Sequence, residues 1–193
     1  MNTWEAREAA RIGAAVKTLR AKRTAQWLAD RTTEIGMKMT RQTITDLENG
    51  RRRYVTTAEL AVLAAALDTA PIALLYPGPY DRQVEVLPGI TWPTEIDAAQ
   101  WFCGLRPGFS EAVGAEQVRV RTEYNNNTRD LQKWRELLDL YKQRSDLRAP
   151  DPNKENDVEV YRLLLRNLNT QIDSLRLELR LINMDDLGAE DGG

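Results

Sequence analysis

The sequence predicts an all-α protein in two helical parts, and three features of the chain support this fold class. Apolar residues recur every three or four positions through most of its 193 residues, which is the spacing of one face of a helix. Threonines, prolines and glycines stand where helices are expected to begin and end. The alternation typical of a strand is confined to residues 83–86, ahead of Pro88 and Gly89. We expect that stretch to be a short strand or an extended linker without a strand partner.

Residues 1–80 are expected to form a five-helix domain. The expected helices cover residues 4–23, 25–35, 41–48, 57–67 and 72–76. The apolar residues of the first helix, at the spacing of one buried face, are Ala9, Ile12, Ala15, Val16 and Leu19. Thr24 and Thr40 can cap the second and third helices, Thr56 or Thr57 can cap the fourth, and Gly36 and Gly50 can end the second and third.

The third helix carries the functional prediction. Ile44 and Leu47 lie on one face, and polar side chains occupy the rest of its surface. Arginine and glutamine can bond guanine and adenine edges through two hydrogen bonds, threonine can contact a thymine methyl, and aspartate can accept from cytosine. The candidate base contacts are Thr40, Arg41, Gln42, Thr43, Thr45 and Asp46.

Two helices joined by a glycine-containing turn, the second ending in Leu47-Glu48-Asn49-Gly50, resemble the lambda-repressor-like (XRE) helix-turn-helix family. The resemblance covers residues 11–76 and implies a recognition helix that begins at Thr40 and enters the major groove. There are two departures from the family pattern. The turn over residues 33–38 is longer, and Ala25 stands where the family often has a phosphate-contacting glutamine. The chain looks most like actinobacterial or actinophage regulators that carry a C-terminal helical extension.

The charge distribution agrees with DNA binding by the N-terminal part. The whole chain has a net charge of −2, but residues 1–80 carry 12 Lys+Arg and 8 Asp+Glu, a net charge of +4, and residues 81–193 carry −6. Such asymmetry is typical of a nucleic-acid-binding domain joined to an acidic one. Double-stranded DNA is therefore the expected partner. The candidate phosphate contacts are Thr24, Gln26, Lys38, Asn49, Arg51, Arg52 and Arg53.

Composition argues against enzymatic function. The chain has no histidine and one cysteine, Cys103, which removes the common zinc-ligand sets and any Cys–His nucleophile. It also has no Gly-rich phosphate loop or nucleophile motif, so no catalytic residue, metal site or cofactor is predicted. Trp101 and Phe102 precede Cys103, which favours a buried structural thiol over a redox sensor. We expect a cytoplasmic protein, because the chain has neither a signal-peptide pattern nor an apolar run of ~18 residues.

Residues 81–109 are expected to link the two helical parts. Trp92, Trp101, Phe102 and Phe109 gather aromatic surface around a short helix that begins near Thr94. These side chains could line a pocket for a small-molecule effector, or they could pack domains or subunits together. The second interpretation is favoured, because no converging set of polar groups accompanies the aromatic residues.

Residues 110–193 are expected to form an antiparallel hairpin of coiled-coil helices. The second helix has a heptad seam of Val158, Tyr161, Leu165, Leu168, Ile172, Leu175, Leu179 and Ile182. The helix before it has a weaker seam of Val120, Tyr124, Asn127, Leu131, Trp134, Leu138 and Tyr141. Asn127 could fix the register of this seam. Asp151 and Pro152 are expected to cap and begin the second helix.

The last helix has a second apolar face. Its residues are Leu163, Leu177, Leu181 and Met184. A helix with two apolar faces needs two neighbours, and the simplest second neighbour is another copy of the chain. We therefore expect a homodimer; the alternative is that this face covers the aromatic linker of the same chain.

Together these features predict a sequence-specific DNA-binding transcriptional regulator, most simply a repressor that occludes a promoter. Two tethered DNA-binding domains would reach half-sites about one DNA turn, ~34 Å, apart. The alternative is a protein-interaction adaptor whose coiled coil is the functional surface and in which DNA binding is secondary or absent. Salt-dependent DNA binding distinguishes these two classes, because only phosphate contacts release counterions.

Overall fold

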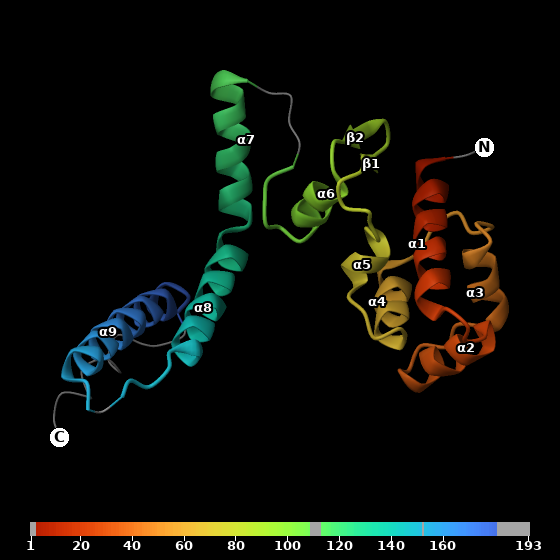
Figure 1. The fold of residues 1–193 in the computed structure, drawn as a ribbon. Helices are drawn as coiled ribbons and strands as arrows, with labels where there is room; N and C mark the ends of the chain where they lie inside the picture. Colours follow the sequence, from red (N-terminus) through yellow and green to blue (C-terminus); the bar gives the residue numbers. More distant parts are fainter. Residues whose placement is uncertain (1–2, 109–112, 152, 181–193) are drawn as a thin grey trace. The chain divides into compact units, whose positions relative to one another are not determined.

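The computed structural model describes residues 3–108, 113–151 and 153–180, and the chain divides into two compact units. Unit 1 spans Met1–Glu111 and unit 2 spans Ala112–Gly193. Figure 1 shows the mostly helical fold, to which a small two-stranded sheet is added. The all-α prediction therefore holds for most of the described chain but misses this sheet.

Unit 1 begins with five helices in the predicted order. They are α1 (Trp4–Arg20), α2 (Ala25–Glu34), α3 (Arg41–Glu48), α4 (Thr57–Ala66) and α5 (Pro71–Leu75). Thr24, Thr40 and Thr56 cap α2, α3 and α4 through side-chain oxygens that accept backbone N–H groups, as the sequence predicts. The first helix is shorter than expected. It ends at Arg20 because Ala21 adopts a left-handed conformation with φ of 54°.

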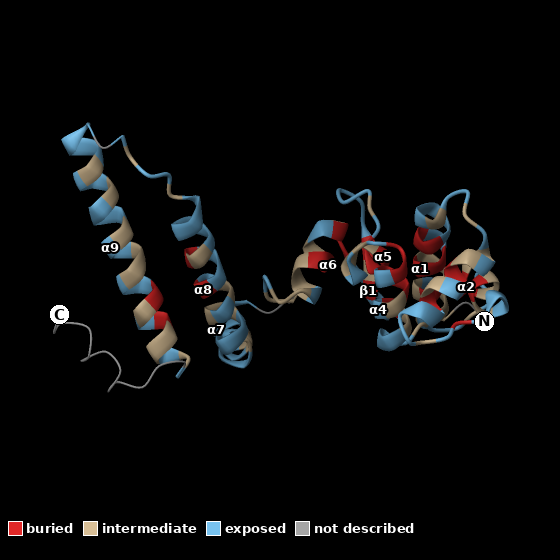
Figure 2. Ribbon diagram, turned by 90° about the horizontal axis from the view of Figure 1, so that it is seen from below, coloured by how far each residue is buried: buried red, intermediate tan, exposed pale blue. Residues whose placement is uncertain are grey.

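The five helices pack around one apolar core. Its fully buried side chains include Val16 of α1, Leu28 of α2, Ile44 and Leu47 of α3, Leu63 of α4 and Leu74 of α5. Figure 2 shows the buried stretches of unit 1 in red. The recognition-helix candidate is therefore fixed by its apolar face, and its polar face points away from the core.

The segment predicted to be a linker is part of this core. Strands β1 (Val84–Leu87) and β2 (Ile90–Trp92) form an antiparallel hairpin, so the expectation that the strand has no partner is wrong. Gly89, with φ of 77°, lies in the turn between the strands, a backbone conformation that glycine adopts without steric cost. Helix α6 (Glu95–Phe102) follows. The buried residues that this segment adds are Val84, Val86, Trp92, Ala98 and Ala99.

Unit 2 contains α7 (Gly114–Asn127), α8 (Arg129–Asp146) and α9 (Glu155–Glu178). Helices α8 and α9 form the expected antiparallel hairpin. Lys133 pairs with Glu178 at 2.5 Å near one end, and Arg144 bonds Asn169 at 3.2 Å further along. The predicted seam of α9 is confirmed for Ile172 and Leu175, which are buried, and for Leu168 and Leu179, which pack against them. Ile182, Leu181 and Met184 lie outside the described residues.

The start of α9 differs from the prediction. The helix begins at Glu155, with Lys154 before it and no side-chain cap. Asp151 does not cap the helix. Its carboxylate instead accepts hydrogen bonds from the backbone and side-chain nitrogens of Asn153, at 3.0 and 3.2 Å. Asx turns of this kind compete with helix capping by the same side chain.

Most of the inner face predicted for the helix before α9 is wrong, although Tyr141 of the predicted seam does pack against the α8–α9 core. It is divided at Thr128 into α7 and α8, and Leu137 and Leu140 face α9. Leu138, placed in the inner seam by the heptad pattern, is 59% exposed, and Trp134 is 43% exposed. Two apolar stripes run along α8. The heptad pattern identified the stripe of Trp134 and Leu138, whereas the hairpin buries the stripe of Leu137 and Leu140.

Candidate nucleic-acid interface

Helix α3 is held at its start by a local hydrogen bond and along its inner side by burial. The Thr40 hydroxyl accepts a hydrogen bond from the Thr43 backbone N–H at 3.0 Å, which satisfies a donor that the helix itself leaves unpaired. Ile44 and Leu47 are completely buried. Any surface that α3 presents is therefore pre-formed on a fixed helix.

The end of α3 is fastened to α1 by an ion pair and a close backbone approach. Arg20 donates to both carboxylate oxygens of Glu48, at 2.6 and 2.7 Å, and both side chains are largely buried. The hydrogen bond that Arg20 donates to Glu48 raises the pKa of Arg20, so the guanidinium stays charged. Gly13 lies beside this contact. A Cβ atom there would stand 2.1 Å from the Leu47 carbonyl oxygen, so only glycine fits.

The predicted base-contact residues lie together on the outer side of α3. Thr40, Arg41 and Gln42 are exposed, and Thr43, Thr45 and Asp46 are half-buried. Arg41 makes no side-chain hydrogen bond or ion pair with any described residue. Its guanidinium is therefore available for a bidentate contact to guanine.

Five of these six side chains also bond within the protein, among them those of Thr40 and Thr43, whose hydroxyl oxygens lie 2.8 Å apart. The Gln42 amide donates to Asp46 at 2.9 Å, and the Thr45 hydroxyl donates to the Arg41 carbonyl at 2.8 Å. Asp46 also pairs with Arg51 at 3.5 Å. Asp46 therefore contacts both Gln42 and Arg51 and orients their side chains. Arg41 and Gln42 are the more accessible hydrogen-bond donors of the candidate base contacts.

The candidate phosphate contacts fall into two groups. Lys38, Asn49, Arg51 and Arg53 are exposed around the two ends of α3, as are Thr24 and Gln26 at the start of α2. Thr24 caps α2, and Gln26 donates to Asp30 at 2.8 Å. Arg52 differs from the others. It is half-buried and donates to Glu59 of α4 at 2.6 Å.

The Arg52–Glu59 pair supports the start of α4. Glu59 also accepts from the Thr56 backbone N–H at 2.9 Å while Thr56 accepts from the Glu59 N–H, which makes a capping box. Burial raises the pKa of Glu59, but hydrogen bonds from Arg52 and Thr56, together with the charge of Arg52, outweigh it and hold the pKa below its usual range. In this arrangement Arg52 has a structural partner, whereas Arg51 and Arg53 extend from the surface.

Several residues outside the candidate base and phosphate contacts also shape this surface. Arg23 lies over the ring of Trp27 at 4.1 Å and caps carbonyls at the end of α1. Tyr54 is 62% exposed beside Arg53. The Arg20–Glu48 pair spans 28 positions, so no local pattern could reveal it. The position of Tyr54 directly after three arginines was the one signal available.

Two hollows elsewhere on the described chain are candidate ligand sites. The first, of about 200 Å³, is lined by α5, α6 and flanking residues, among them Tyr76, Ile96 and the half-buried Cys103. It lies beside the aromatic contacts Tyr76–Phe102 and Trp92–Trp101, with ring centroids 6.2 and 5.6 Å apart. These aromatic residues pack α6 and β2 within unit 1, whereas the favoured expectation was that they join two domains or subunits. Phe109 lies outside the described residues.

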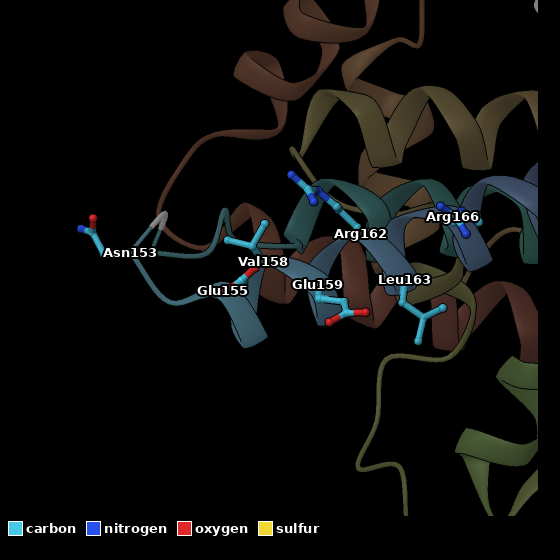
Figure 3. A pocket seen from close by; sticks show the side chains of 7 residues that line it. All are labelled: Asn153, Glu155, Val158, Glu159, Arg162, Leu163 and Arg166. Carbon is cyan, nitrogen blue, oxygen red and sulfur yellow. The ribbon is translucent and has the colours of Figure 1, made fainter.

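The second hollow runs along the start of α9. Its volume is about 870 Å³, and it is lined by Asn153, Glu155, Val158, Glu159, Arg162, Leu163 and Arg166. Figure 3 shows these side chains strung along one helix and the turn before it. The two carboxylates and two guanidiniums of this lining cancel in charge. No second described helix or strand contributes residues to the lining. The groups do not converge as a small-molecule site requires.

Comparison of the chain with family models, with curated proteins and with solved structures finds no match. Within the described ranges, no cluster of three or more acidic or cysteine side chains is suited to hold a metal ion. The described helices also include none with the length and apolar character needed to cross a bilayer.

Proposed function

We propose that this protein is a sequence-specific DNA-binding transcriptional regulator that reads the major groove through α3. The observation that carries the proposal is the exposed pair Arg41 and Gln42 on a helix whose opposite face is completely buried. Exposed Arg51 and Arg53 follow immediately. A fixed helix with bidentate donors on its outer face and cations at its end matches the demands of groove readout and phosphate contact.

The residues take different roles in this proposal. Arg41 and Gln42 contact base edges, and Asp46 orients Gln42 through the 2.9 Å hydrogen bond. Thr40 and Thr43 lie at the end of α3 that enters the groove. Arg51 and Arg53 contact phosphates, which positions the helix but carries no sequence information.

Repression by promoter occlusion is the simplest outcome of such binding. A homodimer formed through unit 2 would hold two copies of unit 1 at half-sites about 34 Å apart. Tethering raises the effective concentration of the second unit once the first has bound. Leu163 and Leu177, predicted for this contact, are exposed and half-buried, respectively, on α9.

The test is DNA binding by the full chain after selection of its preferred site from random DNA. Arg41→Ala and Gln42→Ala should each lower affinity for that site by about 1–3 kcal/mol and affinity for random DNA much less. Gln143→Ala, which changes an exposed glutamine on α8, is the matched control and should have no effect. Equal losses on both kinds of DNA would mean that Arg41 and Gln42 do not read bases.

A protein-interaction adaptor is the second candidate. It is favoured by Leu131, Trp134 and Leu138, which form an exposed apolar stripe on α8. An adaptor without DNA binding would show no salt-dependent affinity, whereas a regulator that contacts several phosphates loses affinity steeply as salt rises.

A further inference from the structure

Helices α7 and α8 carry an apolar stripe that the described part of the chain leaves largely uncovered. Helix α7 has no buried residue, as Figure 2 shows. On α8, Leu131, Trp134 and Leu138 are 45%, 43% and 59% exposed. An isolated helix of 14 residues is marginally stable in water. Burial of this stripe against another protein surface would therefore stabilise both helices.

The stripe keeps a heptad spacing through both helices. With Leu131 at position a and Trp134 at d, position a is also occupied by Gln117, Tyr124 and Leu138, and d by Val120 and Asn127. The bend at Thr128, visible in Figure 1, does not break this phase. The Thr128 N–H bonds the Tyr124 carbonyl and the Gln132 N–H bonds the Thr128 carbonyl, both at 3.0 Å. These two bonds have the i→i−4 pattern of an α-helix and connect the end of α7 to the start of α8.

The charges beside the stripe are sorted by sign. The g positions are Glu116, Glu123, Asp130 and Leu137, of which Leu137 is buried against α9, and the e positions are Arg121, Thr128, Arg135 and Lys142. In a parallel pair of helices each g residue meets an e residue of the partner, so acidic groups meet basic ones. In an antiparallel pair g meets g and e meets e, which brings like charges together. Such e and g charges set orientation in coiled coils.

Ion pairs within one chain do not remove this preference for parallel pairing. Arg119 holds Glu116 and Glu123 at 2.6 and 2.7 Å, but all three side chains are more than half exposed. Exposed pairs of this kind contribute little and exchange readily. The outer face of α9 around Leu163 lacks a comparable sorting, since its flanking residues include Glu159, Arg166 and Asp173 in alternating sign.

We propose that a second copy of this chain occupies the α7–α8 stripe, and that the two copies pair in parallel as a two-stranded coiled coil. Leu131 and Leu138 meet their counterparts across the twofold axis, and the two Asn127 side chains meet at the polar d layer. Parallel pairing places the two Gly114 residues at the same end, so both copies of unit 1 leave the coiled coil together. This pairing takes the place of the predicted contact through Leu163 and Leu177 of α9 as the interface of the dimer that the proposed function uses, and it requires no DNA.

Orientation is tested by cysteine cross-linking in the full chain with Cys103→Ser. Gln117→Cys, at the first a position, should form an intermolecular disulfide under mild oxidation, because parallel pairing brings the same residue of each copy to the axis. Val118→Cys is the matched control, since it neighbours Gln117 but is 66% exposed and lies off the stripe. A Gln117→Cys chain that cross-links no faster than the Val118→Cys chain would overturn the proposal.

Stability of the pairing is tested by sedimentation equilibrium. Leu131→Asp should raise the dimer dissociation constant ~100-fold, because it places two carboxylates at the seam. Helicity should persist, because the residue is 45% exposed within one chain. Asp130→Arg and Arg135→Asp should each weaken the dimer by about 10-fold, and the double variant should restore most of the loss.

Different results would overturn the coiled-coil proposal and the DNA-binding proposal. A wild-type chain that sediments as a monomer at all concentrations overturns the coiled coil, and so does the absence of charge-swap rescue. Specific binding to a single half-site through Arg41 and Gln42 would be unaffected by either result.

Discussion

Replacing Gly13 with alanine tests how closely α3 is fastened to α1. The added Cβ atom would stand 2.1 Å from the Leu47 carbonyl oxygen and 2.8 Å from its carbon. Carbon and oxygen make close contacts at about 3.3 Å, so the two helix backbones would have to separate by about 1 Å. Both clashing atoms belong to backbone, and no side-chain rotation can relieve the overlap.

Two opposing effects set the size of the loss. Alanine is favoured over glycine inside a helix by about 1 kcal/mol, whereas overpacking of this kind costs about 1–3 kcal/mol and occasionally more. Separation of the helices would also lengthen the Arg20–Glu48 hydrogen bonds, which contribute about 1–2 kcal/mol when intact. We expect a net loss of about 2 kcal/mol, equivalent to a fall in Tm of roughly 10 °C for a domain of this size.

Thermal unfolding followed by circular dichroism measures this change. Ala14→Gly is the control, because it changes an exposed position of the same helix and should cost only the propensity difference of about 0.5–1 kcal/mol. Gly13→Ala should also weaken specific DNA binding, since α3 is displaced. A Gly13→Ala protein as stable as the wild type would refute the close approach of α1 and α3.

Three further predictions concern the arginines at positions 51–53, Glu59 of α4 and the α8–α9 hairpin. Arg51→Ala and Arg53→Ala should each weaken binding to all DNA and reduce the dependence of log affinity on log salt concentration by about 1. Arg52→Ala should mainly lower thermal stability. An equal effect of all three variants on the salt dependence would contradict the structural role of Arg52. Because the folded-state pKa of Glu59 is lowered, its ionisation stabilises unit 1 above its usual pKa, and this contribution disappears as pH falls through the folded-state value. Glu59→Gln should therefore cost about 1–2 kcal/mol at pH 7 and progressively less in acid, as measured by urea unfolding at several pH values; a pH-independent difference would argue against this linkage. Leu137→Asp should abolish the α8–α9 pairing and much of the helicity of unit 2, which far-ultraviolet circular dichroism would detect as a large loss of signal.

Local signals explain why most of unit 1 could be predicted from sequence. The caps Thr24, Thr40 and Thr56 act within three residues of themselves, so their effect is visible in the linear chain. The buried face of α3 follows from the spacing of Ile44 and Leu47 alone. These two signals place the candidate base-contact side chains on one exposed surface.

The contacts that set the detail of the site are long-range. Arg20 and Glu48 meet across 28 positions, and Arg7 reaches Glu85 across 78 positions at 2.8 Å. No periodicity within a helix encodes such pairs. The inner face of α8 was missed for a different reason: two apolar stripes share one helix, and a heptad count cannot tell which of them meets α9.

The packing of β1, β2 and α6 against the five N-terminal helices bears on how this protein can be dissected. A fragment ending at Tyr80 would remove Val84, Trp92 and Ala98 from the core and leave Tyr76 and Leu75 facing water. Glu95 would go as well, and with it the 3.1 Å hydrogen bond that its carboxylate accepts from Gly78. The smallest self-sufficient fragment that contains α3 therefore extends through α6, and a gene fusion or domain exchange made at residue 80 would leave apolar core residues exposed to water.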